Sequence, residues 1–312
     1  MKRIVVIGGG TGAYTVLRGL KQYTHYLTAV VSMFDSGGST GKLRDEFGYL
    51  PPGDVRRCIL ALAPETEKTR ILRDLLNYRF TKGEGLSQHS FGNLWLTALT
   101  DIIGNERGAI DYLSSFFNIK GRVLPVTLDN CHLCAELSDG TQIRGETNID
   151  VPKHDGSLRI KRIFLQPSAH ALADSVGAIH DADLVVIGPG DLYTSVLPNI
   201  LVHGIREALQ VTRAKKLYVC NVMTKWGETH GFSASDFVRE VTSYVGCPLD
   251  GVVVNTSTAS SVLVDKYAQE RAFPVQFDKE KITVPIVEAD LLNEKEILRH
   301  DSFKLAKVLI GL

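Results

Sequence analysis

Two kinds of hydrophobic pattern alternate along the chain. Short, nearly continuous apolar runs predict β-strands at residues 3–7, 28–34, 184–187, 216–220 and 251–255. Between them, apolar residues that recur every three or four positions predict helices at residues 14–22, 54–63, 94–103, 199–209, 234–244 and 303–310. Strands that are apolar on both faces are typical of a parallel sheet covered by helices on both sides. We therefore predict a doubly wound α/β fold with a mainly parallel sheet.

One stretch interrupts this alternation. Strand patterns follow one another without intervening helices at residues 123–126, 131–137, 142–146 and 160–165, and Asp139-Gly140 favours a hairpin turn. The pattern predicts a small antiparallel insertion over about residues 123–165, beside the main sheet or at its edge. No linker rich in proline or serine separates it from the remainder, so we expect residues 1–312 to form a single domain.

Composition and charge narrow the class of protein. The 312 residues include 35 Lys and Arg against 35 Asp and Glu, and 44% of them are hydrophobic. The chain can bury a large core, and the lack of a basic excess argues against a general nucleic-acid binder. No apolar run approaches the roughly 18 residues of a membrane span. The apolar run at residues 4–7 ends in glycines, which indicates a first strand and not a signal peptide. We expect a cytoplasmic protein.

The five cysteines are candidate metal ligands. Cys131 and Cys134, in Cys-His-Leu-Cys, look like half of a zinc site, but Cys58, Cys220 and Cys247 stand alone and supply no second ligand pair. An odd number of cysteines without a secretion signal indicates reduced thiols. We predict two thiols in a β-hairpin and no metal site.

A glycine-rich turn follows the first predicted strand. Gly8-Gly9-Gly10-Thr11-Gly12-Ala13 contains the G-x-G-x-x-A form of the dinucleotide fingerprint between a strand and a helix. Glycines let the backbone approach a diphosphate, and the helix N-terminus offers free N–H groups and a positive dipole end. The pattern favours phosphate binding.

A second glycine-rich segment follows the second strand. Asp35 opens the run Asp35-Ser36-Gly37-Gly38-Ser39-Thr40-Gly41-Lys42-Leu43-Arg44, which we interpret as an anion-binding loop, although it lacks the spacing of a nucleoside-triphosphate P-loop. Leu50-Pro51-Pro52-Gly53-Asp54-Val55-Arg56-Arg57 then predicts a rigid turn into a helix, with one arginine placed to pair with a phosphate. His89-Ser90-Phe91-Gly92-Asn93-Leu94 enters another helix, where Asn93 would serve as the N-cap.

The second half of the chain repeats this arrangement. The strand at residues 184–187 runs into Gly188-Pro189-Gly190-Asp191-Leu192-Tyr193-Thr194-Ser195, and the next strand ends at Asn221-Val222-Met223-Thr224. In open parallel sheets, ligands bind outside the carboxyl ends of the strands, near the point where strand order reverses. Four strand ends with Gly, Asp, Asn, Ser or Thr therefore predict one long cleft.

Signatures of covalent catalysis are missing from the sequence. Ser195 lacks the G-x-S-x-G elbow, and the nine histidines include no H-x-x-x-H pair on a helix. His230 and Glu228 could reach the cleft, but neither stands in a recognisable catalytic pattern.

Taken together, these motifs resemble a known family. In order along the chain, they are Gly8–Gly12, Asp35–Arg44, Leu50–Arg56, Phe91–Leu94, Gly188–Ser195, Asn221–Thr224 and Gly227–Thr229. The sequence resembles the YvcK-like gluconeogenesis factors, which are relatives of the 2-phospho-L-lactate transferases (the CofD-like superfamily). The resemblance extends from Met1 to about Asn255.

The resemblance implies a Rossmann-like fold and a nucleotide-linked ligand. In the YvcK-like branch it implies a uridine diphosphate (UDP) sugar, bound to regulate carbon metabolism, the supply of cell-wall precursors and cell shape, with a regulated metabolic enzyme as partner. In the transferase branch it implies moving a phospholactyl group from a guanosine diphosphate-activated donor to a deazaflavin, with magnesium and with Asp35 as the candidate catalytic residue. The family commonly has two aspartates where this chain has Asp35-Ser36, which weakens the expectation of magnesium. A homodimer remains open.

The residues expected to contact the ligand come from all of these segments. They are Gly9, Gly10, Thr11, Gly12, Asp35, Gly37, Gly38, Ser39, Arg44, Gly53, Asp54, Arg56, Asn93, Gly188, Pro189, Gly190, Tyr193, Ser195, Asn221, Met223, Thr224 and Thr229. The leading hypothesis is a nucleotide-sugar-binding regulator, and the alternative is a transferase. A nicotinamide-dependent oxidoreductase is the third candidate, but it rests on the first glycine turn alone.

Overall fold

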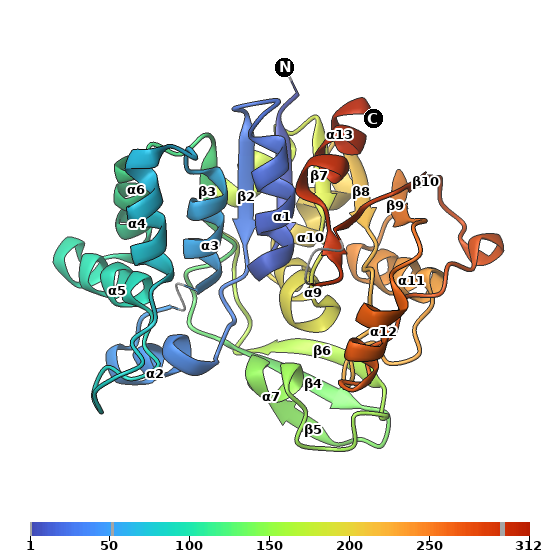
Figure 1. The fold of residues 1–312 in the computed structure, drawn as a ribbon, viewed down its shortest axis with the longest axis horizontal. Helices are drawn as coiled ribbons and strands as arrows, with labels where there is room; N and C mark the ends of the chain where they lie inside the picture. The colour runs from blue at the N-terminus through green and yellow to red at the C-terminus, as the bar shows by residue number, and fades with distance from the viewer. Residues whose placement is uncertain (1, 51–52, 294–296) are drawn as a thin grey trace.

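A computed structural model describes residues 2–50, 53–293 and 297–312 of the chain. Among these residues, seven parallel strands form the central sheet in the order β10-β9-β8-β7-β1-β2-β3 (Figure 1). Their bounds are β1 Ile4–Gly8, β2 Leu27–Val31, β3 Arg122–Pro125, β7 Leu184–Ile187, β8 Lys215–Val219, β9 Gly251–Asn255 and β10 Ile286–Ala289. The predicted parallel α/β fold of Rossmann-like architecture is confirmed.

Helices cover both faces of the sheet. The helices among the described residues are α1 Gly10–Leu20, α2 Gly38–Phe47, α3 Gly53–Leu62, α4 Glu67–Asn77, α5 Phe91–Ile103, α6 Glu106–Phe116, α7 Glu146–Asp150, α8 Ala173–His180, α9 Leu197–Ile200, α10 Ile205–Val211, α11 Ala234–Val245, α12 Ser261–Ala268 and α13 Ser302–Gly311, of which α7 packs on the smaller, antiparallel sheet. Helix α1 packs against α3 and α13 on one face, whereas α8, α10 and α11 pack on the other. Strands β1, β2 and β7 are almost entirely buried, as their continuous apolar runs predict.

A second, antiparallel sheet lies beside the carboxyl ends of the main strands (Figure 1). It has the order β5-β4-β6, with β4 at His132–Leu137, β5 at Gln142–Arg144 and β6 at Ile160–Gln166. The first strand expected in this insertion belongs elsewhere, because β3 pairs in parallel with β2 at the edge of the main sheet. A short two-stranded sheet joins β11 Leu292–Asn293 to β12 Arg299–His300.

Two local expectations were wrong. Residues 38–47, interpreted as a loop, form helix α2, whose first turn still presents backbone N–H groups to anions. The helix expected at 199–209 is divided, since Gly204 adopts a φ of +100° and separates α9 from α10. A π-helical turn at Leu192–Val196 precedes α9. The turn predicted at Pro51-Pro52 lies outside the described residues.

The described residues include no helix long and apolar enough to cross a membrane.

Candidate functional site

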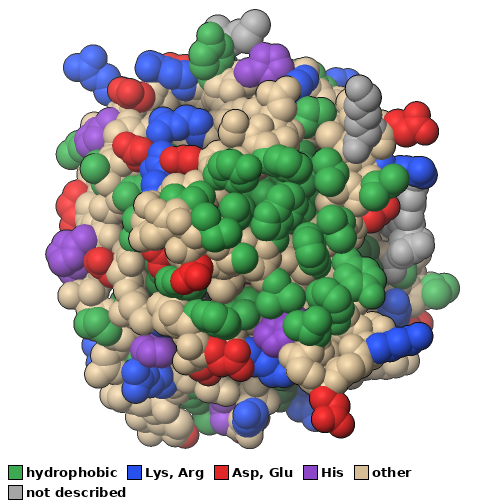
Figure 2. Space-filling view, turned by 90° about the vertical axis from the view of Figure 1, so that its left-hand side faces the viewer, with side chains coloured by type: hydrophobic (Ala, Val, Ile, Leu, Met, Phe, Trp, Pro, Cys, Tyr) green, Lys and Arg blue, Asp and Glu red, His purple; other side chains and the backbone are tan. Residues whose placement is uncertain are grey.

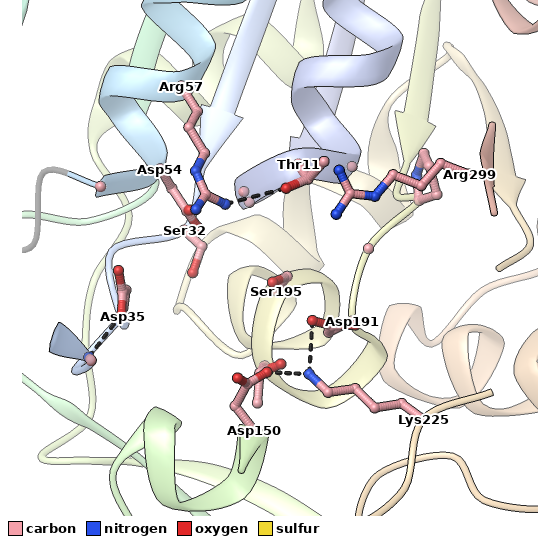
Figure 3. A pocket seen from close by; sticks show the side chains of 18 of the residues that line it. Thr11, Ser32, Asp35, Asp54, Arg57, Asp150, Asp191, Ser195, Lys225 and Arg299 are labelled. Carbon is pink, nitrogen blue, oxygen red and sulfur yellow. Dashed lines mark hydrogen bonds and ion pairs between the residues drawn. The ribbon is translucent and has the colours of Figure 1, made fainter. Parts of the chain in front are cut away.

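A polar cleft of about 620 Å³ opens at the carboxyl ends of the strands (Figure 3). It lies where the strand order reverses between β1 and β7, which is the expected ligand position in this architecture. The structure brings most of the predicted residues together here. They are Gly9, Gly10, Thr11, Gly12, Asp35, Gly37, Gly38, Ser39, Gly53, Asp54, Arg56, Asn93, Pro189, Gly190, Ser195, Asn221, Met223 and Thr224.

The N-terminus of α1 meets the loop after β7 at this reversal point. Gly10 adopts a φ of +56°, a conformation that favours glycine. A Cβ at Gly12 would overlap the Pro189 carbonyl oxygen and would lie 3.0 Å from the Gly190 Cα. Glycine at position 12 therefore allows the start of α1 to contact the loop after β7, and both of these segments border the cleft.

Two arginines point toward the start of α1 from opposite sides (Figure 3). Arg57 Nη1 donates a hydrogen bond to Thr11 Oγ1 at 3.3 Å, and Arg299 of β12 lines the cleft beyond Thr11. Both side chains are exposed, so their guanidinium groups remain available to an anion. Together with the α1 dipole, they make this end of the cleft electropositive.

A carboxyl group also borders the α1 N-terminus. Burial, with the nearby charge of Asp35, raises the pKa of Asp54 to about 7, although Arg57 and the Gly10 N–H act in the opposite direction. The Asp35 carboxylate accepts a hydrogen bond from the Gly37 N–H at 2.9 Å. The cleft therefore holds two carboxyls, and the charge of Asp35 is one cause of the raised pKa of Asp54.

The insertion contributes a third carboxyl near Asp35. Glu146 of α7 accepts a hydrogen bond from the Ser36 N–H at 3.3 Å, and Ser36 Oγ lies 3.2 Å from Thr147 Oγ1. Burial, followed by the charges of Asp35 and Asp150, raises the pKa of Glu146 to about 8. Ser36 thus connects helix α7 of the antiparallel insertion to the segment that follows strand β2.

Lys225 gathers acidic side chains from three segments. Its Nζ lies 2.9 Å from Asp191 Oδ2, 3.1 Å from Glu228 Oε1 and in contact with Asp150 (Figure 3). The oxygens of these three acids lie within 4.8 Å of one another, and the ammonium supplies their counter-charge. Burial would lower the pKa of Lys225, but the three carboxylates raise it.

A buried hydrogen-bond network forms the wall beside α5. Asn93 Oδ1 accepts a bond from Arg56 Nε at 3.1 Å, and Asn93 Nδ2 donates to Thr40 Oγ1 at 3.2 Å. The sequence predicted Asn93 as the N-cap of this helix, but the N-cap is Ser90 and Asn93 lies within the first turn. Arg56 also donates to the Leu76 carbonyl at 2.9 Å, so its guanidinium holds the wall in place.

Comparison with known proteins identifies the family. The family model described as 2-phospho-L-lactate transferase CofD matches residues 4–292. The chain belongs to the CofD family.

Full-length relatives agree with this assignment. A gluconeogenesis factor of Bacillus subtilis (strain 168) is 40% identical over 316 residues, covering 99% of this chain and 98% of that protein. A gluconeogenesis factor of Halalkalibacterium halodurans is 42% identical and covers 99% and 96%. The crystal structure of a UPF0052 family member from Bacillus halodurans superposes with a TM-score of 0.93 at 41% identity, covering 99% of each chain. The resemblance inferred from the motifs is confirmed.

Four predicted residues of this CofD-family chain lie outside the cleft lining. Arg44 is buried in α2 and donates to the Cys131 carbonyl at 2.6 Å, which ties α2 to the start of β4. Tyr193 is buried, and Gly188 packs near Tyr218. Thr229 Oγ1 accepts from the Lys225 backbone N–H at 3.0 Å.

Sequence reasoning missed other lining residues of this CofD-family cleft. Arg299 and His300 come from a two-residue strand near the C-terminus, and Lys225, Glu146 and Asp150 come from segments without a glycine motif. The only available signal was polarity, which does not distinguish a lining residue from a solvated one. The residues expected from the sequence to contact the ligand included Arg56 and not Arg57. It is Arg57 that reaches Thr11 of α1, whereas Arg56 binds Asn93 and the Leu76 carbonyl in the wall.

Proposed function

We propose that this CofD-family protein binds a UDP-sugar in the cleft and acts as a regulator that links carbon metabolism to cell-wall precursor supply and cell shape. The observation that carries the proposal is the N-terminus of α1, which borders the cleft with Arg57 and Arg299 on either side of it. Backbone N–H groups, the helix dipole and two guanidinium groups together suit a diphosphate.

The size and lining of the cleft support a ligand with a sugar and a base on either side of that diphosphate. Its volume of about 620 Å³ falls within the roughly 300–1,000 Å³ of small-molecule sites. Besides the start of α1, the lining includes Asn221, Thr224, Tyr267 and His300. Hydroxyls, amides and an aromatic ring there can bind the hydroxyls and rings of a nucleotide sugar.

Isothermal titration calorimetry with UDP-N-acetylglucosamine tests this proposal directly. We expect one ligand per chain, and we expect Arg57→Gln and Arg299→Gln each to weaken binding about tenfold or more, since each removes a charged hydrogen bond. Arg213→Gln is the control, because Arg213 is exposed just before β8 and so lies at the opposite edge of the sheet. A folded protein that shows no heat at millimolar ligand would refute the proposal.

A transferase activity is the second candidate, favoured by the carboxyls Asp35 and Asp54. Both line the cleft, and Asp54 supplies the second carboxyl that the Asp35-Ser36 sequence lacks. Carboxylate oxygens suit magnesium, so these two residues fit a metal-assisted phospholactyl transfer. With a guanosine diphosphate-activated phospholactate, a deazaflavin and magnesium, product should form, and Asp35→Ala should abolish it. Absence of turnover with every nucleoside diphosphate donor would exclude this candidate.

A further inference from the structure

Two histidines from distant parts of the chain lie side by side outside the cleft. His170 lies between β6 and α8, and His203 lies in the turn between α9 and α10. Their ring centroids are 5.4 Å apart. Neither residue lines the cleft, and neither belongs to helices α4, α5 and α6, which carry the wide field of exposed hydrophobic side chains in Figure 2. The functions proposed above therefore leave this pair unused.

Backbone hydrogen bonds hold the two histidines next to each other. The His203 N–H donates to the Ala169 carbonyl at 2.9 Å, and the Ala171 N–H donates to the His203 carbonyl at 2.9 Å. These bonds form a parallel β-bridge in which His170 stands opposite His203. Ala169 and Val202, the residues that precede the histidines, are fully buried. The two exposed rings therefore stand on a fixed base.

The separation of the rings suits two ligands of one metal ion. Zinc bonds a histidine nitrogen at about 2.0–2.1 Å with tetrahedral angles, which places the centres of two ligating rings roughly 5 Å apart. The observed distance is 5.4 Å, and both side chains are exposed, so small rotations can direct one nitrogen of each ring to a shared ion. Imidazole nitrogens suit zinc, copper and nickel, whereas magnesium and calcium prefer oxygen ligands.

Asp129 supports His170 through both its backbone and its ring. Asp129 Oδ2 accepts a hydrogen bond from the His170 backbone N–H at 2.7 Å and lies 3.5 Å from the ring Nδ1. A carboxylate beside Nδ1 favours the proton on that nitrogen, which leaves the lone pair of Nε2 free for a metal. Histidines that bind metals almost always have such a partner on their other ring nitrogen. His170 therefore has the surroundings of a metal ligand.

An acid also lies close to His203. Glu207 follows it by four residues, and the Gly204 N–H donates to Glu207 Oε2 at 2.8 Å, which holds the carboxylate at the start of α10. Asp129 and Glu207 thus place a negative charge near each histidine. These charges favour a cation between the two rings.

We propose that His170 and His203 bind one zinc ion, with Asp129 as the positioning residue of His170 and water in the remaining tetrahedral positions. The ion connects the segment before α8 to the turn between α9 and α10, and α8 and α10 pack against each other on one face of the sheet. Because the two histidines meet only in the folded chain, zinc binding stabilises the fold. The proposal does not depend on the identity of the ligand in the cleft.

The acids around Lys225 are the competing zinc site. Oxygens of Asp150, Asp191 and Glu228 lie within 4.8 Å of one another. The Lys225 ammonium already lies among them, so a zinc ion would have to displace a cation that is covalently part of the chain. Substitutions in the histidine pair distinguish the two sites, because they leave these acids unchanged.

Isothermal titration calorimetry with zinc chloride tests the proposal. One ion per chain should bind with a dissociation constant in the micromolar range, and His203→Ala should weaken binding about tenfold or more, because a single histidine ligand remains. Asp129→Asn keeps an oxygen for the His170 N–H but removes the charge beside the ring, so it should weaken binding about tenfold. His180→Ala is the matched control, since His180 is an exposed histidine at the end of α8, and it should leave the affinity unchanged.

Urea unfolding separates loss of zinc binding from loss of folding. His203 is exposed, so without zinc His203→Ala should match the unaltered protein in circular dichroism and in its urea midpoint. Zinc at ten times its dissociation constant should lower the unfolding equilibrium constant of the unaltered protein about elevenfold, and this effect should be absent from His203→Ala. Equal zinc affinities for the unaltered protein and His203→Ala would overturn the proposal and assign the ion to another site. A folded protein that gives no heat with zinc would overturn it as well.

Discussion

Replacement of Gly12 by alanine tests whether α1 and the loop after β7 touch as the structure shows. Gly12 lies in the first turn of α1, and an added Cβ would overlap the Pro189 carbonyl oxygen and lie 2.5 Å from its carbonyl carbon. Carbon atoms in contact prefer about 3.5–4.0 Å. The loop and the helix must therefore separate by about 1 Å, and both carry backbone that borders the cleft.

The expected cost follows from overpacking a closely packed contact. Inserting a methyl group that the surroundings cannot accommodate costs about 1–3 kcal/mol. Alanine in a helix is otherwise favoured over glycine by about 0.5–1 kcal/mol. The difference between these two terms is about 1 kcal/mol, so we expect Gly12→Ala to lower the free energy of unfolding by about that amount. It should also weaken UDP-sugar binding, because the displaced loop lines the cleft.

Gly177 provides the matched control for this substitution. It lies within helix α8, and no atom lies within 4 Å of a Cβ built on it. Gly177→Ala should therefore leave stability unchanged or raise it slightly. Urea unfolding followed by circular dichroism measures both variants. If Gly12→Ala unfolds at the same urea concentration as Gly177→Ala, the close contact between α1 and the loop after β7 does not exist.

Three further predictions concern charged and titratable groups. Lys225→Met leaves Asp191, Asp150 and the buried Glu228 without a cation, so it should lower the free energy of unfolding in urea by about 3 kcal/mol. Lys161→Met, which breaks an exposed pair with Glu136, should lower it by less than about 1 kcal/mol. Equal losses for the two variants would contradict the assignment of Lys225 as the counter-charge of the three acids. The pKa of Asp54 is raised to about 7 by burial and by Asp35, so its carboxylate forms as pH rises through 7 and should repel a diphosphate. Calorimetry should therefore show weaker UDP-sugar binding at pH 8 than at pH 6, and Asp54→Asn should remove most of that difference. Affinity that rises with pH would refute the placement of the diphosphate beside Asp54. Burial lowers the pKa of His300 to about 4 from its usual 6.5, so the unfolded chain binds a proton there at a higher pH than the folded chain does. The free energy of unfolding should therefore fall by about 3 kcal/mol as pH decreases from 6.5 to 4. Urea unfolding of the unaltered protein and of His300→Gln at both pH values should show that the variant lacks this part of the pH dependence.

Much of the candidate site was predictable because its motifs follow strand ends. Gly9 to Gly12, Asp35, Gly190 and Asn221 all stand where an apolar run stops, and the carboxyl ends of parallel strands meet at one edge. Their convergence on one cleft therefore needs only the local pattern and the rules of sheet topology. The arginine that extends over α1 was harder to predict from the sequence. Arg56 and Arg57 are neighbours with the same chemistry, and only the directions in which they leave α3 distinguish them.

Contacts between distant segments escaped sequence reasoning. Lys225 meets Asp150, and Arg44 binds the Cys131 carbonyl, but no local pattern announces either pair. Helices α4 and α6 were also not predicted from the sequence.

By itself, the sequence determined the class of fold, the strands that carry it and the edge at which the cleft opens. Hydrophobic periodicity and glycine turns are local properties, and the physics of a parallel sheet translates them directly into position. Only the tertiary structure decided that residues 38–47 are helical, that Gly204 divides a helix and that Arg57 and Arg299 flank α1. These features depend on packing and on charges that come together from remote parts of the chain, so their free energy is not encoded in any short segment.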